Sequence, residues 1–211
     1  MKIPLIPQQD YIRIAMTIYS LLIGVKANIE QSCVWFSMFG SAVLERHYKL
    51  KPNIYMGIAA YMVDDVSNSV LIFAEKTGRN YLSSQDGYHC WIEVDGFVID
   101  FSAPLFPLMV KNNDGQSLSE PKMFQKKIVS MADSISQLKT SGDFFMSTNT
   151  TLTNELMNKF MATPCIMDLA NICCDWYRKP LLEMPKSVSI SNESGITNNV
   201  PFQEICVSGA W

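Results

Sequence analysis

The chain has 211 residues, and this length favours a single globular domain that spans residues 1–211. Hydrophobic residues make up 48% of the chain and charged residues 18%, so it is not intrinsically disordered, collagen-like or of low complexity. The formal net charge of −3 gives no basic surface, and neither nucleic acid nor a membrane is therefore expected as a partner.

The cysteines and histidines limit the compartments and cofactors that we expect. Six cysteines are too sparse for a disulfide scaffold, which favours reduced thiols in the cytoplasm. Two histidines and no C-x-x-C pair leave few ligands for zinc, and we expect no metal or other cofactor. The apolar run over residues 14–25 is shorter than the roughly 20 residues of a membrane span. Export by a signal peptide is a minor alternative, because Pro4, Pro7 and Asp10 fit a basic leader poorly.

The first half of the chain predicts two helices followed by strands. Residues 9–25 have apolar side chains at helical spacing and end at a polar break. Residues 32–48 are apolar on nearly every side, which is typical of a helix buried at the centre of a domain. Beyond a break at Pro52, strands are predicted at residues 54–63 and 70–74.

A β-hairpin over residues 88–101 is the clearest local signal. Two alternating runs flank Asp95-Gly96, the preferred sequence of a two-residue type I′ turn. Placing these two residues in the turn fixes the register of the strands. The predicted pairs are Val94 with Phe97, Ile92 with Ile99, and Trp91 with Asp100.

This register divides the hairpin side chains between two faces of the sheet, since side chains alternate along a strand. His89 and Asp100 fall on one face as diagonal neighbours, with backbones about 7–8 Å apart, a gap that their side chains can close. A carboxylate placed to hold an imidazole is the base-and-orienter part of a catalytic triad. The apolar face has Cys90, Ile92, Val94, Phe97, Ile99 and Phe101, and the other has His89, Trp91, Glu93, Val98, Asp100 and Ser102.

The second half of the chain gives weaker signals. We interpret residues 28–107 as the catalytic core and residues 108–211 as a C-terminal helical and loop region. Helices are predicted at residues 121–139 and 151–178, a polar surface loop at 185–199, and a last strand at 200–207.

Cys33 is the candidate nucleophile because it lies in the first turn of the helix predicted over residues 32–48. Backbone N–H groups at a helix N-terminus stabilise a thiolate, and a neighbouring imidazolium adds to that effect. The same N–H groups can hold the oxyanion that forms when a thiolate attacks a carbonyl. In the predicted site Cys33 attacks, His89 acts as base and then as acid, and Asp100 orients the imidazole. The prediction requires the N-terminus of the helix to meet the His89 face of the sheet.

Ordinary structural roles are the alternatives for these side chains. Free cysteine is among the most buried residue types, so Cys33 also fits a small hydrophobic residue in an apolar helix. His89 also fits a hydrogen-bonded histidine on a half-buried sheet, whereas a buried Asp100 requires a partner. His47 is predicted to interact with the C-terminal dipole of its helix, and Cys90 is predicted to be a core residue.

The segment from His89 to Asp100 reads His-Cys-Trp-Ile-Glu-Val-Asp-Gly-Phe-Val-Ile-Asp. It resembles the His-x-Trp-x-Glu-Val…Gly-x-x-x-Asp core of transglutaminase-like proteins, which belong to the wider papain-like cysteine fold. A helix-borne cysteine upstream, as at Cys33, is part of the same pattern. The resemblance covers about residues 31–104, and at full length the chain resembles an uncharacterised bacterial family of that superfamily, a domain of unknown function. It implies an α+β, papain-like fold with N-terminal helices packed on an antiparallel sheet.

Two positions near the nucleophile bear on the oxyanion site that the resemblance implies. Papain-like proteases carry a glutamine six residues before the nucleophile, where this chain has Ala27. Gln31 is the nearest candidate for a replacement donor. Trp91 is expected to line or brace the site.

We therefore expect a thiol-dependent hydrolase or acyltransferase that acts on an amide, ester or isopeptide bond in a peptide, a protein or a small molecule. Water or an amine would resolve the thioester intermediate, and the sequence favours neither. The alternatives are a non-catalytic binding or regulatory module on the same fold, and a toxin or immunity partner without catalysis. No oligomeric state follows from the sequence.

Overall fold

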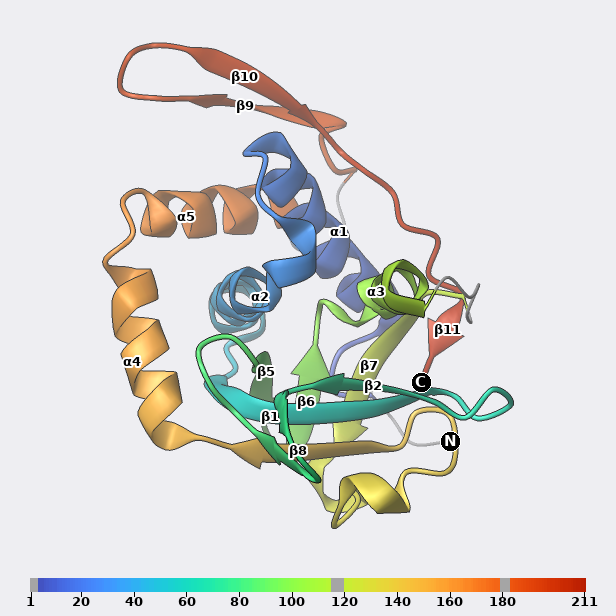
Figure 1. Ribbon diagram of the computed structural model, residues 1–211. Coiled ribbons are helices and arrows are strands. Elements are labelled where there is room, and N and C mark those ends of the chain that lie inside the picture. The colour runs from blue at the N-terminus through green and yellow to red at the C-terminus, as the bar shows by residue number, and fades with distance from the viewer. Residues whose placement is uncertain (1–3, 115–119, 179–182) are drawn as a thin grey trace.

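The computed structural model describes residues 4–114, 120–178 and 183–211, and it has a mixed α+β architecture (Figure 1). Its helices are α1 (Gln8–Gly24), α2 (Cys33–Tyr48), α3 (Phe106–Asp114), α4 (Thr150–Met161) and α5 (Ile166–Tyr177). Its strands are β1 (Asn53–Asp64), β2 (Ser69–Phe73), β3 (Glu75–Thr77), β4 (Asn80–Leu82), β5 (His89–Val94), β6 (Phe97–Asp100), β7 (Lys122–Lys127), β8 (Phe144–Thr148), β9 (Ser187–Ser191), β10 (Thr197–Pro201) and β11 (Gly209–Ala210).

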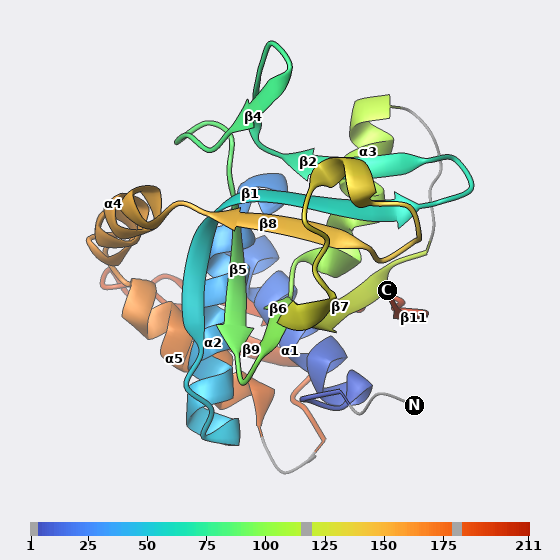
Figure 2. The same ribbon diagram turned by 90° about the horizontal axis from the view of Figure 1, so that it is seen from below.

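A seven-stranded sheet forms the centre of the fold (Figure 2). Its strands follow the order β11-β7-β6-β5-β1-β2, and β8 pairs with β1 beside that path. Every pair in the sheet is antiparallel except the short parallel pair β11–β7, so the sheet is mixed. The long strand β1 links two parts of the sheet, because β5 pairs with its first residues while β2 and β8 pair with its later ones.

Helices α1, α2 and α5 gather on one side of the sheet, and α2 packs against β5 and against both other helices (Figures 1 and 2). This close approach requires the glycine at position 40. A Cβ atom there would lie 2.3 Å from the ring of Phe101 and 3.3 Å from Ile92. The apolar face of the β5–β6 hairpin therefore meets α2, and the helix predicted to be central is in contact on several sides.

Several sequence predictions agree with this structure. The helices predicted at residues 9–25 and 32–48 are α1 and α2, and the strands predicted next are β1 and β2. The predicted hairpin is present in the predicted register, with Ile92 opposite Ile99. Asp95 and Gly96 have φ values of 49° and 77°, and the type I′ turn requires positive φ at both positions. In the part of the chain that the structure describes, we find no helix with the length and hydropathy of a membrane span.

The prediction of a helix over residues 121–139 is wrong. This segment contains β7 and two 3₁₀ turns, at Ile128–Ser130 and Ile135–Gln137. Because β7 pairs with β6 and buries Met123 and Phe124, the sheet ladder and core packing outweigh the local helix propensity.

The C-terminal predictions are wrong in three places. The helix predicted at residues 151–178 is two helices, α4 and α5, because Pro164 cannot continue the backbone hydrogen bonds of α4. The loop predicted at residues 185–199 contains the β9–β10 hairpin, whose first strand alternates serine with Val or Ile. Of the strand predicted at residues 200–207, only the first two residues are in a strand, because β10 ends at Pro201. The next strand, β11, begins at Gly209.

Candidate active site

Cys33 is the first residue of α2, and its side chain is half-buried. The preceding Ser32 does not cap the helix, because its hydroxyl donates to the carbonyl oxygen of Asn28 at 2.5 Å. The first N–H groups of α2 therefore have no acceptor from Ser32, and helix geometry gives them no intrahelical acceptor. A thiolate on Cys33, or an oxyanion formed beside it, would meet the positive end of the helix dipole.

His89 begins β5 and is fully buried. Its Nε2 atom lies 2.6 Å from Oδ2 of Asp100, the last residue of β6. Its Nδ1 atom is also buried and has no hydrogen-bond partner within the described residues. Phe73, at the end of β2, stacks on the imidazole with 4.1 Å between ring centroids and an interplanar angle of 22°. The ring is thus fixed through Nε2, and Nδ1 is the nitrogen available to Cys33.

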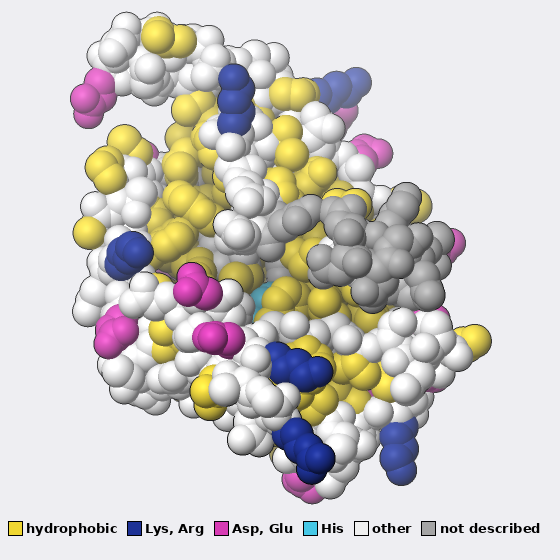
Figure 3. Space-filling view, viewed as in Figure 1, with side chains coloured by type: hydrophobic (Ala, Val, Ile, Leu, Met, Phe, Trp, Pro, Cys, Tyr) yellow, Lys and Arg dark blue, Asp and Glu magenta, His cyan; other side chains and the backbone are white. Residues whose placement is uncertain are grey.

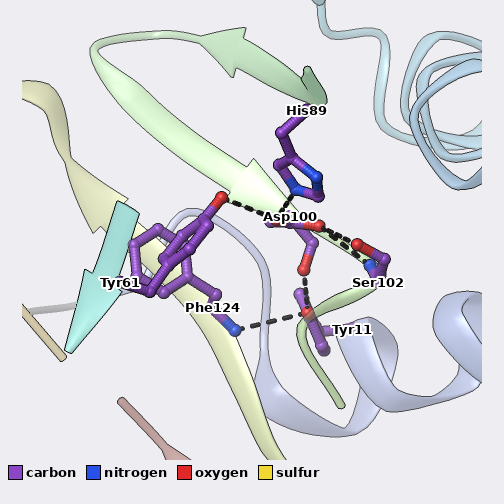
Figure 4. Close-up of polar contacts among 6 residues, drawn as sticks. All are labelled: Tyr11, Tyr61, His89, Asp100, Ser102 and Phe124. Carbon is purple, nitrogen blue, oxygen red and sulfur yellow. Dashed lines mark hydrogen bonds and ion pairs between the residues drawn. The ribbon is translucent and has the colours of Figure 1, made fainter. Parts of the chain in front are cut away.

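The Asp100 carboxylate is the centre of a buried hydrogen-bond network (Figure 4). Its Oδ2 atom accepts from the hydroxyl of Tyr61 at 2.7 Å in addition to its contact with His89. Its Oδ1 atom accepts from the backbone N–H and the hydroxyl of Ser102, at 3.0 and 2.6 Å. The hydroxyl of Tyr11 donates to the backbone carbonyl oxygen of Asp100 and accepts from a backbone N–H of β7. The network fixes the carboxylate, and the carboxylate fixes the imidazole.

These contacts favour the charged form of both His89 and Asp100. Burial alone would lower the pKa of His89, but the Asp100 carboxylate and the Cys33 side chain raise it to about 10. Burial also opposes ionisation of Asp100, but the imidazole and the donors Ser102 and Tyr61 hold the pKa of Asp100 below its usual value. At neutral pH the arrangement is therefore an imidazolium paired with a carboxylate, which can stabilise a neighbouring thiolate.

Cys33 and His89 line one cavity of about 330 Å³. Figure 3 looks onto a hollow lined by hydrophobic side chains, with a histidine visible at its floor and acidic side chains along one rim. The N-terminus of α2 therefore meets the histidine, as the predicted triad requires. The other lining residues are Gln31, Phe73, Gln85, Asp86, Tyr88 and Met109.

The other side chains predicted at or near the site lie in different environments. Gln31 lines the cavity together with Cys33. Trp91 is fully buried in the main core, where its indole N–H donates to Glu93 at 3.0 Å, and it is not among the residues that line the cavity. His47 lies in the last turn of α2, as predicted, with Nε2 2.9 Å from the carbonyl oxygen of Cys174. Cys90 is buried in the core, as predicted.

Three participating side chains were missed by the sequence reasoning. Tyr11 and Tyr61 contact Asp100 from α1 and β1, and Phe73 covers His89 from β2. Aromatic residues on helices and strands most often pack in the core. The spacing of these three residues in the sequence therefore gives no indication that they contact the site. Ser102 had a usable signal, since it falls on the predicted His89 face two residues after Asp100.

The described residues contain no group of three or more His, Cys, Asp or Glu side chains that could hold a metal ion.

The fold and the site together define a mixed α+β protein in which a helix-borne cysteine shares a cavity with a buried histidine–aspartate pair. Residues 7–211 match the model of the family described as "Protein of unknown function (DUF2026)", and the chain belongs to this family. The chain is also similar to a solved crystal structure described as genomics APC5867. The two share 34% sequence identity with a TM-score of 0.88, over 100% of this chain and 99% of the other. No curated protein matches the chain. The predicted resemblance to a family of unknown function is thus confirmed.

Proposed function

We propose that this protein is a thiol-dependent hydrolase or acyltransferase in which Cys33 is the nucleophile, His89 the acid–base group and Asp100 the orienting group. The observation that carries the proposal is the buried Nδ1 atom of His89, which has no hydrogen-bond partner among the described residues and belongs to a side chain that lines the same cavity as Cys33. A fully buried polar nitrogen without a hydrogen bond is costly in a structural role. It is useful where a substrate or a thiol has to exchange a proton with it.

The proposed reaction begins with attack of the Cys33 thiolate on the carbonyl carbon of an amide, ester or isopeptide. The first N–H groups of α2 hold the resulting oxyanion, and Gln31 is a further candidate donor from the same cavity. The bond from carbon to the leaving group breaks while the His89 imidazolium gives its proton to that group, and a thioester remains on Cys33. Water or an amine then attacks the thioester, His89 takes the proton, and the Cys33 thiolate leaves.

The proposal extends to the finer classification of the fold as papain-like and transglutaminase-like. Three features support it: the cysteine at the start of a helix, the histidine and aspartate on adjacent antiparallel strands, and the order of the three residues along the chain. On this proposal the substrate is a peptide, a protein or a small amide or ester, and the protein acts in the cytoplasm without a cofactor.

Acylation of Cys33 tests the proposed function directly. We expect p-nitrophenyl acetate to acetylate Cys33, with a burst of p-nitrophenol that is absent in Cys33→Ala. Peptide mapping by mass spectrometry identifies the labelled thiol, and the exposed Cys165 and Cys206 are controls within the same molecule. Labelling of Cys33 no faster than that of these two cysteines would contradict the proposal and favour a non-catalytic binding module.

A further inference from the structure

A second cavity, of about 300 Å³, adjoins the one that contains Cys33. The two cavities have Gln85, Asp86 and Tyr88 in common, and Tyr88 immediately precedes His89. The two cavities therefore lie side by side, next to the reacting side chains. A substrate with its carbonyl group at Cys33 would have the second cavity on one side of the bond that breaks.

The far wall of this second cavity is one face of α4. Leu156 and Phe160 are four residues apart, so they lie on the same side of the helix and form an apolar surface. The ring of Phe160 packs edge-on against Trp35, with 4.6 Å between centroids. Because Trp35 is two residues after Cys33 on α2, this contact fixes the apolar wall relative to the nucleophile.

Two charged side chains of opposite sign also line the second cavity. Lys159 is next to Phe160 on α4, and Asp86 comes from the loop before β5. Both side chains are exposed, and neither forms a salt bridge with another described residue. These groups complement an apolar α-amino acid. The ammonium of Lys159 fits its carboxylate, the carboxylate of Asp86 fits its amine, and the apolar surface of α4 fits its side chain.

We infer that the second cavity binds the amine side of the scissile bond as an apolar amino acid with a free α-carboxylate. Lys159 pairs with the α-carboxylate, and Leu156 and Phe160 contact the side chain. This inference rests on the proposed function: the nitrogen takes the His89 proton as the C–N bond breaks and leaves as a neutral amine, which then takes a second proton from water and lies as an ammonium beside Asp86. In the transfer direction the same amino acid loses a proton to His89, and its nitrogen attacks the thioester.

The activity test compares an N-acylated dipeptide that ends in phenylalanine with the same dipeptide as its C-terminal amide. We expect kcat/KM to be about 1.5-fold to fivefold higher for the free acid, the range of an ion pair with an exposed lysine. Lys159→Gln should remove the preference, Lys159→Arg should keep it, and Lys139→Gln, an exposed lysine outside both cavities, is the matched control. Acylation of Cys33 with equal rates for acid and amide would overturn the inference and leave the proposed function standing.

A binding measurement separates the two ideas in the other direction. In Cys33→Ala, which cannot form a thioester, we expect calorimetry to detect binding of phenylalanine and weaker binding of phenylalaninamide, with the difference lost in the Lys159→Gln double variant. If this binding is found while Cys33 of the wild-type protein is not acylated, the two results together would support the binding site and contradict the proposed function. Equal binding of the two ligands, or no binding of either, would overturn the inference.

Discussion

The Nε2 atom of His89 lies 2.6 Å from Oδ2 of Asp100 within a site where both side chains are at most 1% exposed. A buried ion pair is stable only when further hydrogen bonds satisfy its remaining polar atoms. Here Tyr61 and Ser102 satisfy the carboxylate, whereas the Nδ1 atom of the imidazole has no partner in the described residues. The asymmetry is what an acid–base group requires, because one side is held and the other is free to exchange a proton.

Tyr61→Phe tests the support of the carboxylate. The variant removes one donor to a charged, buried acceptor and should lower the free energy of unfolding by roughly 1.5–3 kcal/mol. It should also raise the pKa of Asp100, because the charged form of the carboxyl group loses one of its hydrogen-bond donors. Urea denaturation and NMR titration of Asp100 measure the two effects.

Tyr55→Phe is the matched control for this variant. Tyr55 lies on the same strand, and its hydroxyl has no hydrogen bond to a described residue. Equal stability losses in the two variants would contradict the role given to Tyr61.

The pKa of His89 predicts how stability depends on pH. The pKa is about 10 in the folded protein, against an ordinary value of about 6.5 in the unfolded chain. Between these values the folded protein binds the proton more tightly, so the contribution of His89 is complete below pH 6.5 and is lost as the pH rises toward 10. The lowered pKa of Asp100 acts in the acid range, where its contribution is lost as the pH falls below about 3.9.

His89→Gln should remove the alkaline component of this pH dependence. We expect the stability difference between wild type and variant to be largest at about pH 6 and to shrink toward pH 10, as measured by chemical denaturation across the range. A difference that stays constant from pH 6 to 10 would mean that His89 is neutral in the folded protein.

Gly40→Ala tests the close packing of α2 on the β5–β6 hairpin. The added Cβ atom would lie 2.3 Å from the ring of Phe101, so helix and sheet have to separate. We expect a loss of about 1–3 kcal/mol of stability from overpacking, although alanine is the better helix former. Gly209→Ala is the control, since a Cβ atom there meets nothing within 4 Å. Thermal unfolding that shifts equally in both variants would argue against this packing constraint.

Local signals in the sequence were sufficient for the elements that build the site. The Asp95-Gly96 turn fixes the register that puts His89 and Asp100 on one face. The polar segment before α2 indicates where the helix begins, and this places Cys33 in its first turn. The contacts of Tyr11 and Phe73 with the site depend on which elements pack together. Sequence spacing carries no information on such long-range packing.

The C-terminal region was predicted less well for a related reason. Residues 122–127 form a strand because β6 offers a ladder and the core accepts Met123 and Phe124, neither of which is a local property. The wall that α4 contributes beside Tyr88 was likewise beyond sequence reasoning, since it depends on the contact of Phe160 with Trp35.

The rate of Cys33 alkylation by iodoacetamide as a function of pH, in wild type and in His89→Gln, tests the central claim most directly. An imidazolium beside the thiol and a helix N-terminus predict rapid labelling of Cys33 at pH 6 in the wild type, and a loss of at least about tenfold in the variant. The exposed Cys165 and Cys206, resolved by peptide mapping, should react slowly at pH 6 in both proteins. Cys33 labelling that is slow at pH 6 and equal in the two proteins would contradict the claim that Cys33, His89 and Asp100 form a reactive unit.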